Sequence, residues 1–217
     1  MASDNLIALI KVLRERTGAG MMDCKKALEA NDCDVDKAID WLREKGIAKQ
    51  AAKQSRIAAE GMASTLVNGN EALIIEINCE TDFVAKGDRF QNLVKEVATA
   101  TLANHCADVE AAKELTNQLF VDATVSMGEK LSYRRFEVIA KEDGQEFGAY
   151  VHMGGKIAVV TVTDKNAEVA KGLAIHIAAN NPQYISMNDI PADVLEHERA
   201  VTLEAAKNDE KLANKPE

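Results

Sequence analysis

The spacing of the apolar residues changes from about 3.6 to 2 after the first 60 residues, and this change restricts the fold more than any other feature. Before it, Leu6 and Ile10 are four residues apart, as on one face of a helix. After it, Leu73, Ile75 and Ile77 occupy alternate positions, as on one face of a strand. The sequence therefore predicts an α+β fold, with a helical N-terminal part followed by antiparallel sheets and their helices.

Residues 1–46 are predicted to form a three-helix docking bundle. The first helix ends at Gly18-Ala19-Gly20, the second covers residues 22–30, and the third ends with Gly46 as the residue beyond its C-cap. Residues 47–60 are polar, rich in alanine and basic, so we expect a partly helical linker there.

Residues 61–132 are predicted to form the first core subdomain. Strands at residues 62–67 and 72–79 flank Asn68-Gly69, a strong hairpin signal because the turn requires positive φ. Two helices are expected to follow the hairpin and to cover one face of the sheet.

Residues 133–188 are predicted to form the second core subdomain. Three strands, around Phe136, Phe147 and Ile157, are expected to form a meander, and a helix follows at residues 167–180. The last segment, residues 189–217, is predicted to be a charged helical arm. Because it has no partner helix behind it, we expect it to be the incomplete first part of a hairpin.

The composition excludes several classes of function. The chain has 217 residues, a net charge of -9 and 4% aromatic residues, which argues against nucleic-acid binding. No apolar run of about 18 residues could span a membrane, and the N-terminus lacks an export signal. We therefore expect a cytoplasmic protein with free thiols, whose partner is another protein or a small molecule.

No segment predicts catalysis. Gly154-Gly155-Lys156 fails the phosphate-loop pattern, because Tyr150 occupies the position of the first glycine and Ile157 follows the lysine. No nucleophile motif and no metal-ligand spacing is present. We expect no enzyme, no metal and no cofactor.

Two segments have two interpretations each. Met21 and Met22 follow a small-residue loop between basic side chains, so they either offer an adaptable contact to an acidic partner or fill the bundle core, and spacing favours the core. Asp82 and Phe83 follow a buried strand, so Phe83 either projects as a wedge or packs as a staple under the helix start. The residues alone favour the staple.

Two long segments closely resemble the signatures of the bacterial elongation factor Ts family: residues 14–28 (RERTGAGMMDCKKAL) and residues 78–85 (NCETDFVA). Three further landmarks occur in the family's order: Arg134-Arg135, residues 150–157 (YVHMGGKI), and residues 176–179 (HIAA) before Pro182. The resemblance runs from about residue 5 to the C-terminus.

The resemblance implies a guanine nucleotide exchange factor that binds the GDP form of elongation factor Tu and accelerates GDP release during protein biosynthesis. It implies that the N-terminal bundle is ubiquitin-associated-like and docks on the GTPase. The docking residues carried over from the family are Arg14, Thr17, Gly18, Ala19, Met21, Met22 and Lys25.

The resemblance also implies two contact groups in the core. One would disturb the magnesium site of the GTPase, and its residues are Thr81, Asp82, Phe83, Val84 and Ala85. The other comprises Met127, Gly128, His152 and Met153. Such a factor makes and breaks no bond, so it needs no catalytic residue and no cofactor.

The family commonly continues through a helical hairpin and a C-terminal module, and we expect this sequence to stop within the first part of that hairpin. One alternative is therefore a truncated docking or scaffold form that binds the GTPase without efficient exchange. Self-association through the core, as in some family members, is a second open expectation.

Overall fold

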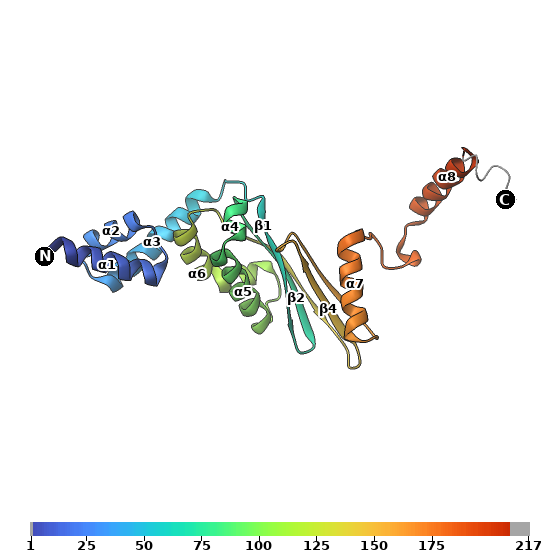
Figure 1. Cartoon of the computed structure of the whole chain (residues 1–217), viewed down its shortest axis with the longest axis horizontal. Coiled ribbons are helices and arrows are strands. Elements are labelled where there is room, and N and C mark those ends of the chain that lie inside the picture. The colour runs from blue at the N-terminus through green and yellow to red at the C-terminus, as the bar shows by residue number, and fades with distance from the viewer. Residues whose placement is uncertain (1, 209–217) are drawn as a thin grey trace. The chain divides into compact units, whose positions relative to one another are not determined.

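The computed structural model describes residues 2–208, and the chain divides into two compact units, Met1–Ala178 and Ala179–Glu217. The described residues form an α+β fold (Figure 1). The helices are α1 (Ala2–Thr17), α2 (Met21–Ala30), α3 (Val35–Lys53), α4 (Asp82–Lys86), α5 (Asp88–Ala103), α6 (Val109–Met127), α7 (Ala167–Asn180) and α8 (Ala192–Asn208). The strands are β1 (Glu60–Asn68), β2 (Glu71–Cys79), β3 (Ser132–Ala140), β4 (Glu146–His152) and β5 (Ile157–Thr163).

Helices α1, α2 and α3 pack around a small apolar core, as the sequence predicts. Leu13, Cys24 and Leu28 are fully buried in it. Helix α1 ends before Gly18, whose φ of 68° is a conformation that glycine adopts without steric cost. Asp34 caps α3 by accepting hydrogen bonds from the backbone N–H groups of the first turn.

The predicted end of the third helix at Gly46 is wrong, because α3 continues to Lys53. Gly46 lies where α3 crosses α6, and a Cβ atom there would stand 2.6 Å from Cγ2 of Val125 and 3.0 Å from Cγ1 of Val121. The glycine therefore permits a close helix–helix approach instead of ending the helix. The predicted linker is partly helical, since only its first residues belong to α3.

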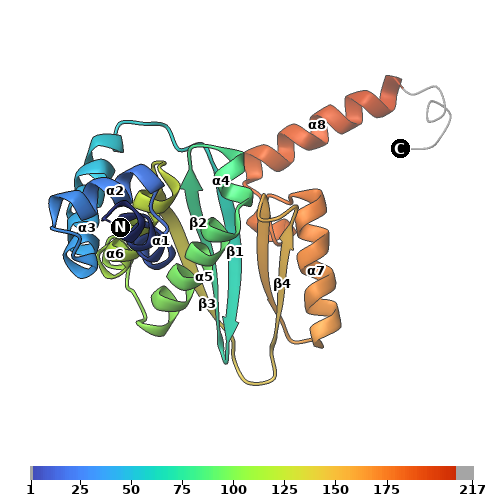
Figure 2. The same ribbon diagram turned by 60° about the vertical axis from the view of Figure 1, so that its left-hand side comes forward.

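The first sheet is antiparallel with the order β1-β2-β3. Helices α5 and α6 lie on one face of it (Figure 2). The alternation seen in the sequence puts Leu73, Ile75 and Ile77 of β2 on that covered face, where they pack against Phe90 and Val94 of α5. Burial of these side chains is the main stabilising contribution of the core.

The predicted three-stranded meander is wrong, because β3 pairs with β2 and not with β4. The apolar residues of β3 explain this pairing. Phe136 lies opposite Ile75 and Val138 lies opposite Leu73, so both join the core under α5 and α6. Strands β4 and β5 form a separate two-stranded antiparallel sheet.

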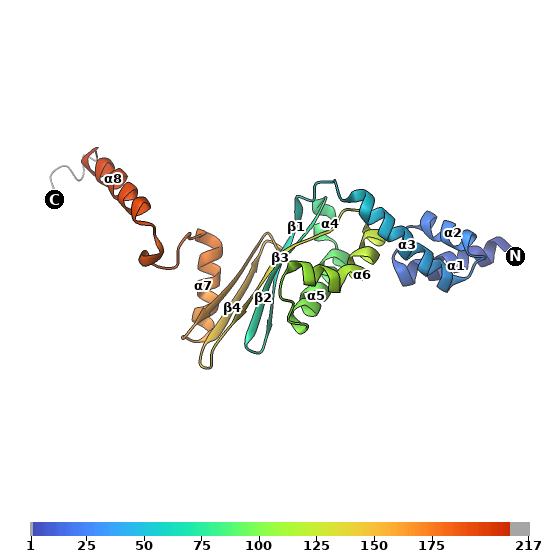
Figure 3. The same cartoon turned by 180° about the vertical axis from the view of Figure 1, so that it is seen from behind.

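The β4–β5 hairpin makes close contacts with α7 and with β1 (Figure 3). A Cβ at Gly148 would lie 2.0 Å from the carbonyl oxygen of Ala170, so only glycine admits α7 at this distance. At the turn between the strands, the carbonyl of Gly155 accepts a 2.7 Å hydrogen bond from the N–H of Ala63. The segment that fails the phosphate-loop pattern is therefore a turn that fastens the hairpin to β1.

The second unit contains helix α8, preceded by a short 3-10 turn at Met187–Asp189. Of the predicted arm, Ala192–Asn208 are helical, and residues 209–217 lie outside the described residues. Val194, Val201 and Leu203 are exposed on this helix.

Candidate partner-binding site

The corner, defined as residues 80–86, joins β2 to the first core helix. Thr81 caps α4, and its hydroxyl accepts a hydrogen bond from the N–H of Val84. Ala85 is buried in the core below, whereas the side chain of Phe83 is 85% exposed. The staple interpretation of Phe83 is therefore wrong, because its ring does not pack under the helix.

Asp82 forms an ion pair with Lys86, with 2.7 Å between Oδ2 and Nζ. This hydrogen bond, together with the lysine charge, lowers the pKa of Asp82 below its ordinary value. The carboxylate is therefore ionised at neutral pH and lies next to the exposed ring.

Glu129, which follows α6, holds the start of the corner through hydrogen bonds. Its carboxylate accepts hydrogen bonds from the N–H of Glu80 at 3.0 Å, from the N–H of Thr81 at 3.1 Å, and from the hydroxyl of Thr81 at 2.6 Å. Nothing in the sequence marks Glu129 for this role, since the two segments are 48 residues apart.

The bundle loop, defined as residues 17–25, exposes both methionines. Met21 is 59% exposed and Met22 is 63% exposed, so the core interpretation is wrong for both. Ala19 is fully buried beneath them, and its N–H donates to the hydroxyl of Thr17. The side chain of Ala19, like that of Ala85, supports the surface instead of forming it.

The basic residues beside the bundle loop lie at the surface. Arg14 is exposed near the end of α1, and Lys25 is half-buried and pairs with Glu29 at 3.6 Å. Asp23 pairs with Lys49 of α3 at 2.9 Å, which fastens the start of α2 to the third helix. Isolated surface pairs of this kind stabilise the fold little.

Met127 and Gly128 lie at the C-terminal end of α6. Met127 is half-buried and packs against the core cluster, whereas Gly128 is exposed and has a φ of 74° as the C-cap residue. This left-handed conformation directs the chain from α6 toward Glu129 and β3.

His152 and Met153 lie at the turn between β4 and β5. Nδ1 of His152 is 2.9 Å from the hydroxyl of Tyr150, and Met153 is 74% exposed with a φ of 47°. The pKa of the neighbouring Lys156 is raised, first by its hydrogen bond to Glu60 and in smaller part by the Asp82 carboxylate. The turn is therefore near enough to the corner for their charges to interact.

Arg89 of α5 connects the bundle loop with the end of α6. Its guanidinium donates to the carbonyl of Gly18 at 3.0 Å and to that of Ser126 at 3.5 Å. Sequence reasoning missed this residue, since an arginine in the first turn of a helix carries no signal for such a contact.

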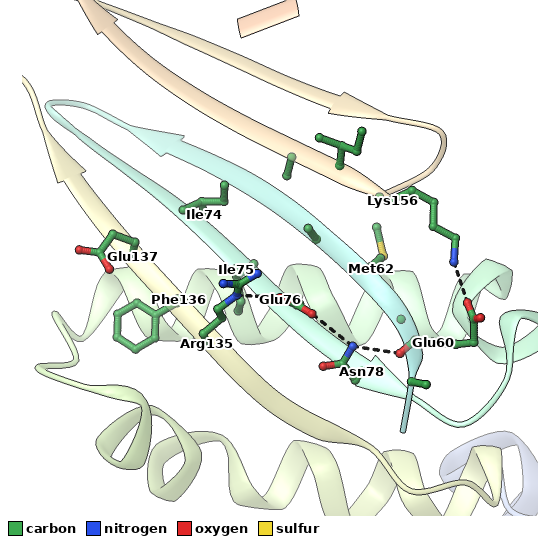
Figure 4. Close-up of a pocket in the computed structure, with 16 residues that line it drawn as sticks. Glu60, Met62, Ile74, Ile75, Glu76, Asn78, Arg135, Phe136, Glu137 and Lys156 are labelled. Atoms are coloured by element: carbon green, nitrogen blue, oxygen red, sulfur yellow. Dashed lines mark hydrogen bonds and ion pairs between the residues drawn. The ribbon is translucent and has the colours of Figure 1, made fainter. Parts of the chain in front are cut away.

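A cavity of about 620 Å³ lies on the other face of the first sheet, near the start of β5 (Figure 4). A bulge in β3 allows both Arg134 and Arg135 to reach Glu76, at 3.4 Å and 2.7 Å. The amide of Asn78 donates to the carbonyl of Glu60, and Glu60 pairs with Lys156. These polar groups pair with one another, and their arrangement suggests no reaction.

Among the side chains that the structure describes, residues 5–208, no group of three or more His, Cys, Asp or Glu is placed to hold a metal ion. In the same part of the chain, no helix is long and apolar enough to cross a membrane.

The described residues thus define an α+β protein that presents apolar side chains on braced loops, the kind of surface that binds another protein. The family model for elongation factor TS matches residues 80–217, more than half of the sequence, and the match begins at the corner. The chain belongs to the elongation factor Ts family. This family consists of nucleotide exchange factors of elongation factor Tu, which serve protein biosynthesis and are not catalytic enzymes in the usual sense.

Proposed function

We propose that this chain is a guanine nucleotide exchange factor that binds the GDP form of elongation factor Tu and promotes GDP release, with the corner as the displacing element. The observation that carries the proposal is the exposure of Phe83 on a corner that donates three hydrogen bonds to Glu129, two from the backbone and one from the hydroxyl of Thr81. An exposed aromatic ring on a braced corner is suited to enter a partner, because a backbone that is already fixed loses little conformational freedom on binding.

The proposed mechanism follows from how a GTPase holds its nucleotide. GDP is bound through phosphate contacts to a loop, its lysine and Mg²⁺. A partner that displaces the elements around Mg²⁺ weakens phosphate binding, and each 1.4 kcal/mol so removed lowers nucleotide affinity by about tenfold. In this proposal Phe83 contributes apolar area and Asp82 contributes negative charge near the ion. By linkage, GDP weakens the binding of the exchange factor by the same factor.

The bundle loop is proposed to supply the docking affinity. Met21 and Met22 offer flexible apolar contacts, and Arg14 and Lys25 add positive charge that attracts an acidic partner surface. The likeness of the bundle to a ubiquitin-associated domain stays a prediction. Because the mechanism makes and breaks no bond, it involves no catalytic residue and no cofactor of this chain.

The end of α6 and the turn after β4 are proposed as flanking contacts. The partner would be contacted around the inserted corner by the half-buried Met127 and by the exposed Gly128 and Met153. His152, whose Nδ1 lies next to the hydroxyl of Tyr150, would also contact it. Supporting evidence is the electrostatic proximity of Lys156 to Asp82, which brings the turn after β4 near the corner.

The test is the release of fluorescently labelled GDP from elongation factor Tu in a stopped-flow instrument, with increasing concentrations of this chain. We expect a saturating acceleration that is largely lost in Phe83→Ala. Val67→Ala is the matched control, because Val67 is also exposed but lies beside the turn at the other end of the β1–β2 hairpin.

The outcomes separate the candidate roles. An unchanged release rate in Phe83→Ala would refute the wedge role. Binding of the chain without any acceleration would support the docking or scaffold alternative. Equal losses in Val67→Ala and Phe83→Ala would mean that general surface damage, and not the ring at the corner, explains the effect.

A further inference from the structure

The three residues after α6 connect segments that are far apart in the sequence. The carbonyl of Gly128 accepts a hydrogen bond from Nζ of Lys53, at the end of α3. The carboxylate of Glu129 accepts three hydrogen bonds from the corner. The ammonium group of Lys130 donates to the carbonyls of Gln54 and Arg56, at 2.6 Å and 2.8 Å. We name residues 128–130 the junction.

The junction also donates a hydrogen bond to a carboxylate of the corner. Oε1 of Glu80 accepts a 2.6 Å hydrogen bond from the backbone N–H of Lys130, and both oxygens of Glu80 lie 3.3 Å from the guanidinium of Arg56. The carboxylate of Glu129 thus bonds to the backbone of the corner, and the carboxylate of Glu80 bonds to the backbone of the junction. A reciprocal arrangement of this kind fixes the orientation of both segments more strongly than a single bond would.

From these contacts we propose that Glu129 is a positioning residue for exchange: it holds the corner in the orientation in which Phe83 can enter the GTPase. The inference rests on the proposed function, and it goes beyond it by assigning a role to a residue outside the contact groups. Glu129 acts through the backbone of residues 80 and 81, so its own contact with the partner is not required.

The physical reason is that α4 is too short to hold its own position. It has five residues, and the hydroxyl of Thr81 caps its first turn. Without Glu129, the N–H groups of Glu80 and Thr81 would turn to water, and the start of α4 would sample several orientations. Fewer molecules would then present Phe83 correctly, which lowers the rate of displacement at saturation without removing the docking surface.

The first experiment compares GDP release with wild type, Glu129→Ala and Glu129→Gln. We expect Glu129→Ala to lower the maximal release rate by about tenfold while the half-saturating concentration changes less than twofold. Glu129→Gln should recover most of the rate. Its amide oxygen can accept both backbone N–H bonds, and its NH₂ group can donate to the hydroxyl of Thr81.

A double variant distinguishes positioning from general damage. If Glu129 acts only through Phe83, Phe83→Ala combined with Glu129→Ala should be no slower than Phe83→Ala alone. If the two losses multiply instead, Glu129 has a separate effect and the positioning role is refuted.

Hydrogen exchange gives a readout that does not depend on GDP release. In Glu129→Ala, the amides of residues 80 and 81 should exchange at least tenfold faster, while those of Ile75 and Ile77 in β2 should keep their wild-type rates. Equal loss of protection in the β2 amides would show that the variant has lost its core, and then the positioning role fails as an explanation.

The failures of the two proposals can be told apart. No acceleration by the wild-type chain would overturn the proposed function and the positioning role with it. Acceleration that depends on Phe83 but is unchanged in Glu129→Ala would overturn the positioning role alone.

Discussion

The bundle loop and the corner follow the same structural plan but are held in different ways. In each, a buried cysteine thiol donates to a carbonyl of the loop: Cys24 to Ala19 at 3.7 Å and Cys79 to Thr81 at 3.2 Å. In each, a buried alanine lies beneath exposed apolar side chains. The bundle loop is held mainly by bonds within its own three helices, whereas the corner is braced by a carboxylate from a distant segment.

The exposed apolar side chains of the two segments differ in flexibility. A methionine has three flexible torsions and adapts to a partner surface, whereas a phenylalanine ring has only two and keeps its shape. A helix start that carries two flexible methionines suits docking, and a braced corner that carries one ring suits displacement. The comparison therefore predicts that the two loops affect different kinetic quantities.

The largest expected effect separates these two quantities in the GDP-release measurement. Met21→Ala combined with Met22→Ala should raise the half-saturating concentration by about tenfold and leave the maximal rate within about twofold. Phe83→Ala should instead lower the maximal rate by about 30-fold, equivalent to about 2 kcal/mol of lost apolar contact. If both variants changed only the half-saturating concentration, the two loops would have the same role and the comparison would fail.

The second prediction concerns the thiol beneath the corner. Burial raises the pKa of Cys79 from 9.0 to about 11. The unfolded chain therefore releases this proton at lower pH than the folded chain. The stabilising contribution is complete below pH 9 and is lost as the pH rises through 11. We expect a loss of about 2 kcal/mol in the free energy of unfolding between pH 8 and pH 10.5.

Urea unfolding at several pH values checks this prediction, and Cys79→Ala is the comparison variant because it removes the titrating group. Its stability should fall less steeply than that of wild type between pH 9 and pH 10.5. Tyr133, whose pKa burial raises to about 12, remains in both proteins and accounts for a shared part of the alkaline loss. Parallel profiles for the two proteins would exclude Cys79 as the cause.

Much of the local structure could be predicted from the sequence. The period of the apolar residues places α1, α5 and α7, and Asn68-Gly69 predicts the β1–β2 hairpin, because these features depend on neighbouring residues alone. The predicted end of the third helix fails at Gly46, since a glycine that ends a helix and one that admits a second helix look alike in sequence.

The pairing of β3 could not be predicted for a related reason. Its alternation shows that one face is buried, but the partner strand depends on which core Phe136 and Val138 join. At the candidate site, residue type and local sequence suggested Met21, Met22 and Phe83, yet only the structure shows that all three are exposed. Glu129 bonds to Thr81, which is 48 residues away in the sequence, and Arg89 bonds to Gly18, which is 71 residues away. No local sequence pattern could predict either contact.

The third prediction tests how firmly the bundle is joined to the core, using two helical glycines with opposite surroundings. Gly46→Ala puts a Cβ 2.6 Å from Val125 and 3.0 Å from Val121, whose β-branched side chains have little rotamer freedom in a helix. Gly172→Ala in α7 meets no atom within 4 Å. We expect Gly46→Ala to lower the free energy of unfolding by about 1 kcal/mol, and Gly172→Ala to raise it by about 0.5 kcal/mol.

Urea unfolding measures both variants, and the sign of the difference decides the outcome. Stabilisation by both substitutions would show that α3 and α6 adjust at no cost, so that the bundle is loosely attached. In that case nucleotide exchange would not require the bundle loop and the corner to be held at a fixed distance and orientation. Destabilisation by Gly46→Ala alone would support a close, rigid crossing of the two helices.

The smallest expected effect concerns Lys86 and its ion pair with Asp82. Lys86 is largely in solvent and Asp82 is about half exposed, so Lys86→Met should leave the urea midpoint unchanged within error. The pKa of Asp82 should nevertheless rise toward its ordinary value, because the lysine is the first cause of its depression. NMR titration of the Asp82 carboxyl group would measure this rise. If the maximal rate of GDP release is also unchanged near neutral pH, where the carboxylate is ionised with or without the lysine, then exchange does not require the pairing of Asp82 with Lys86. A lower rate would assign Lys86 a contact of its own with the partner.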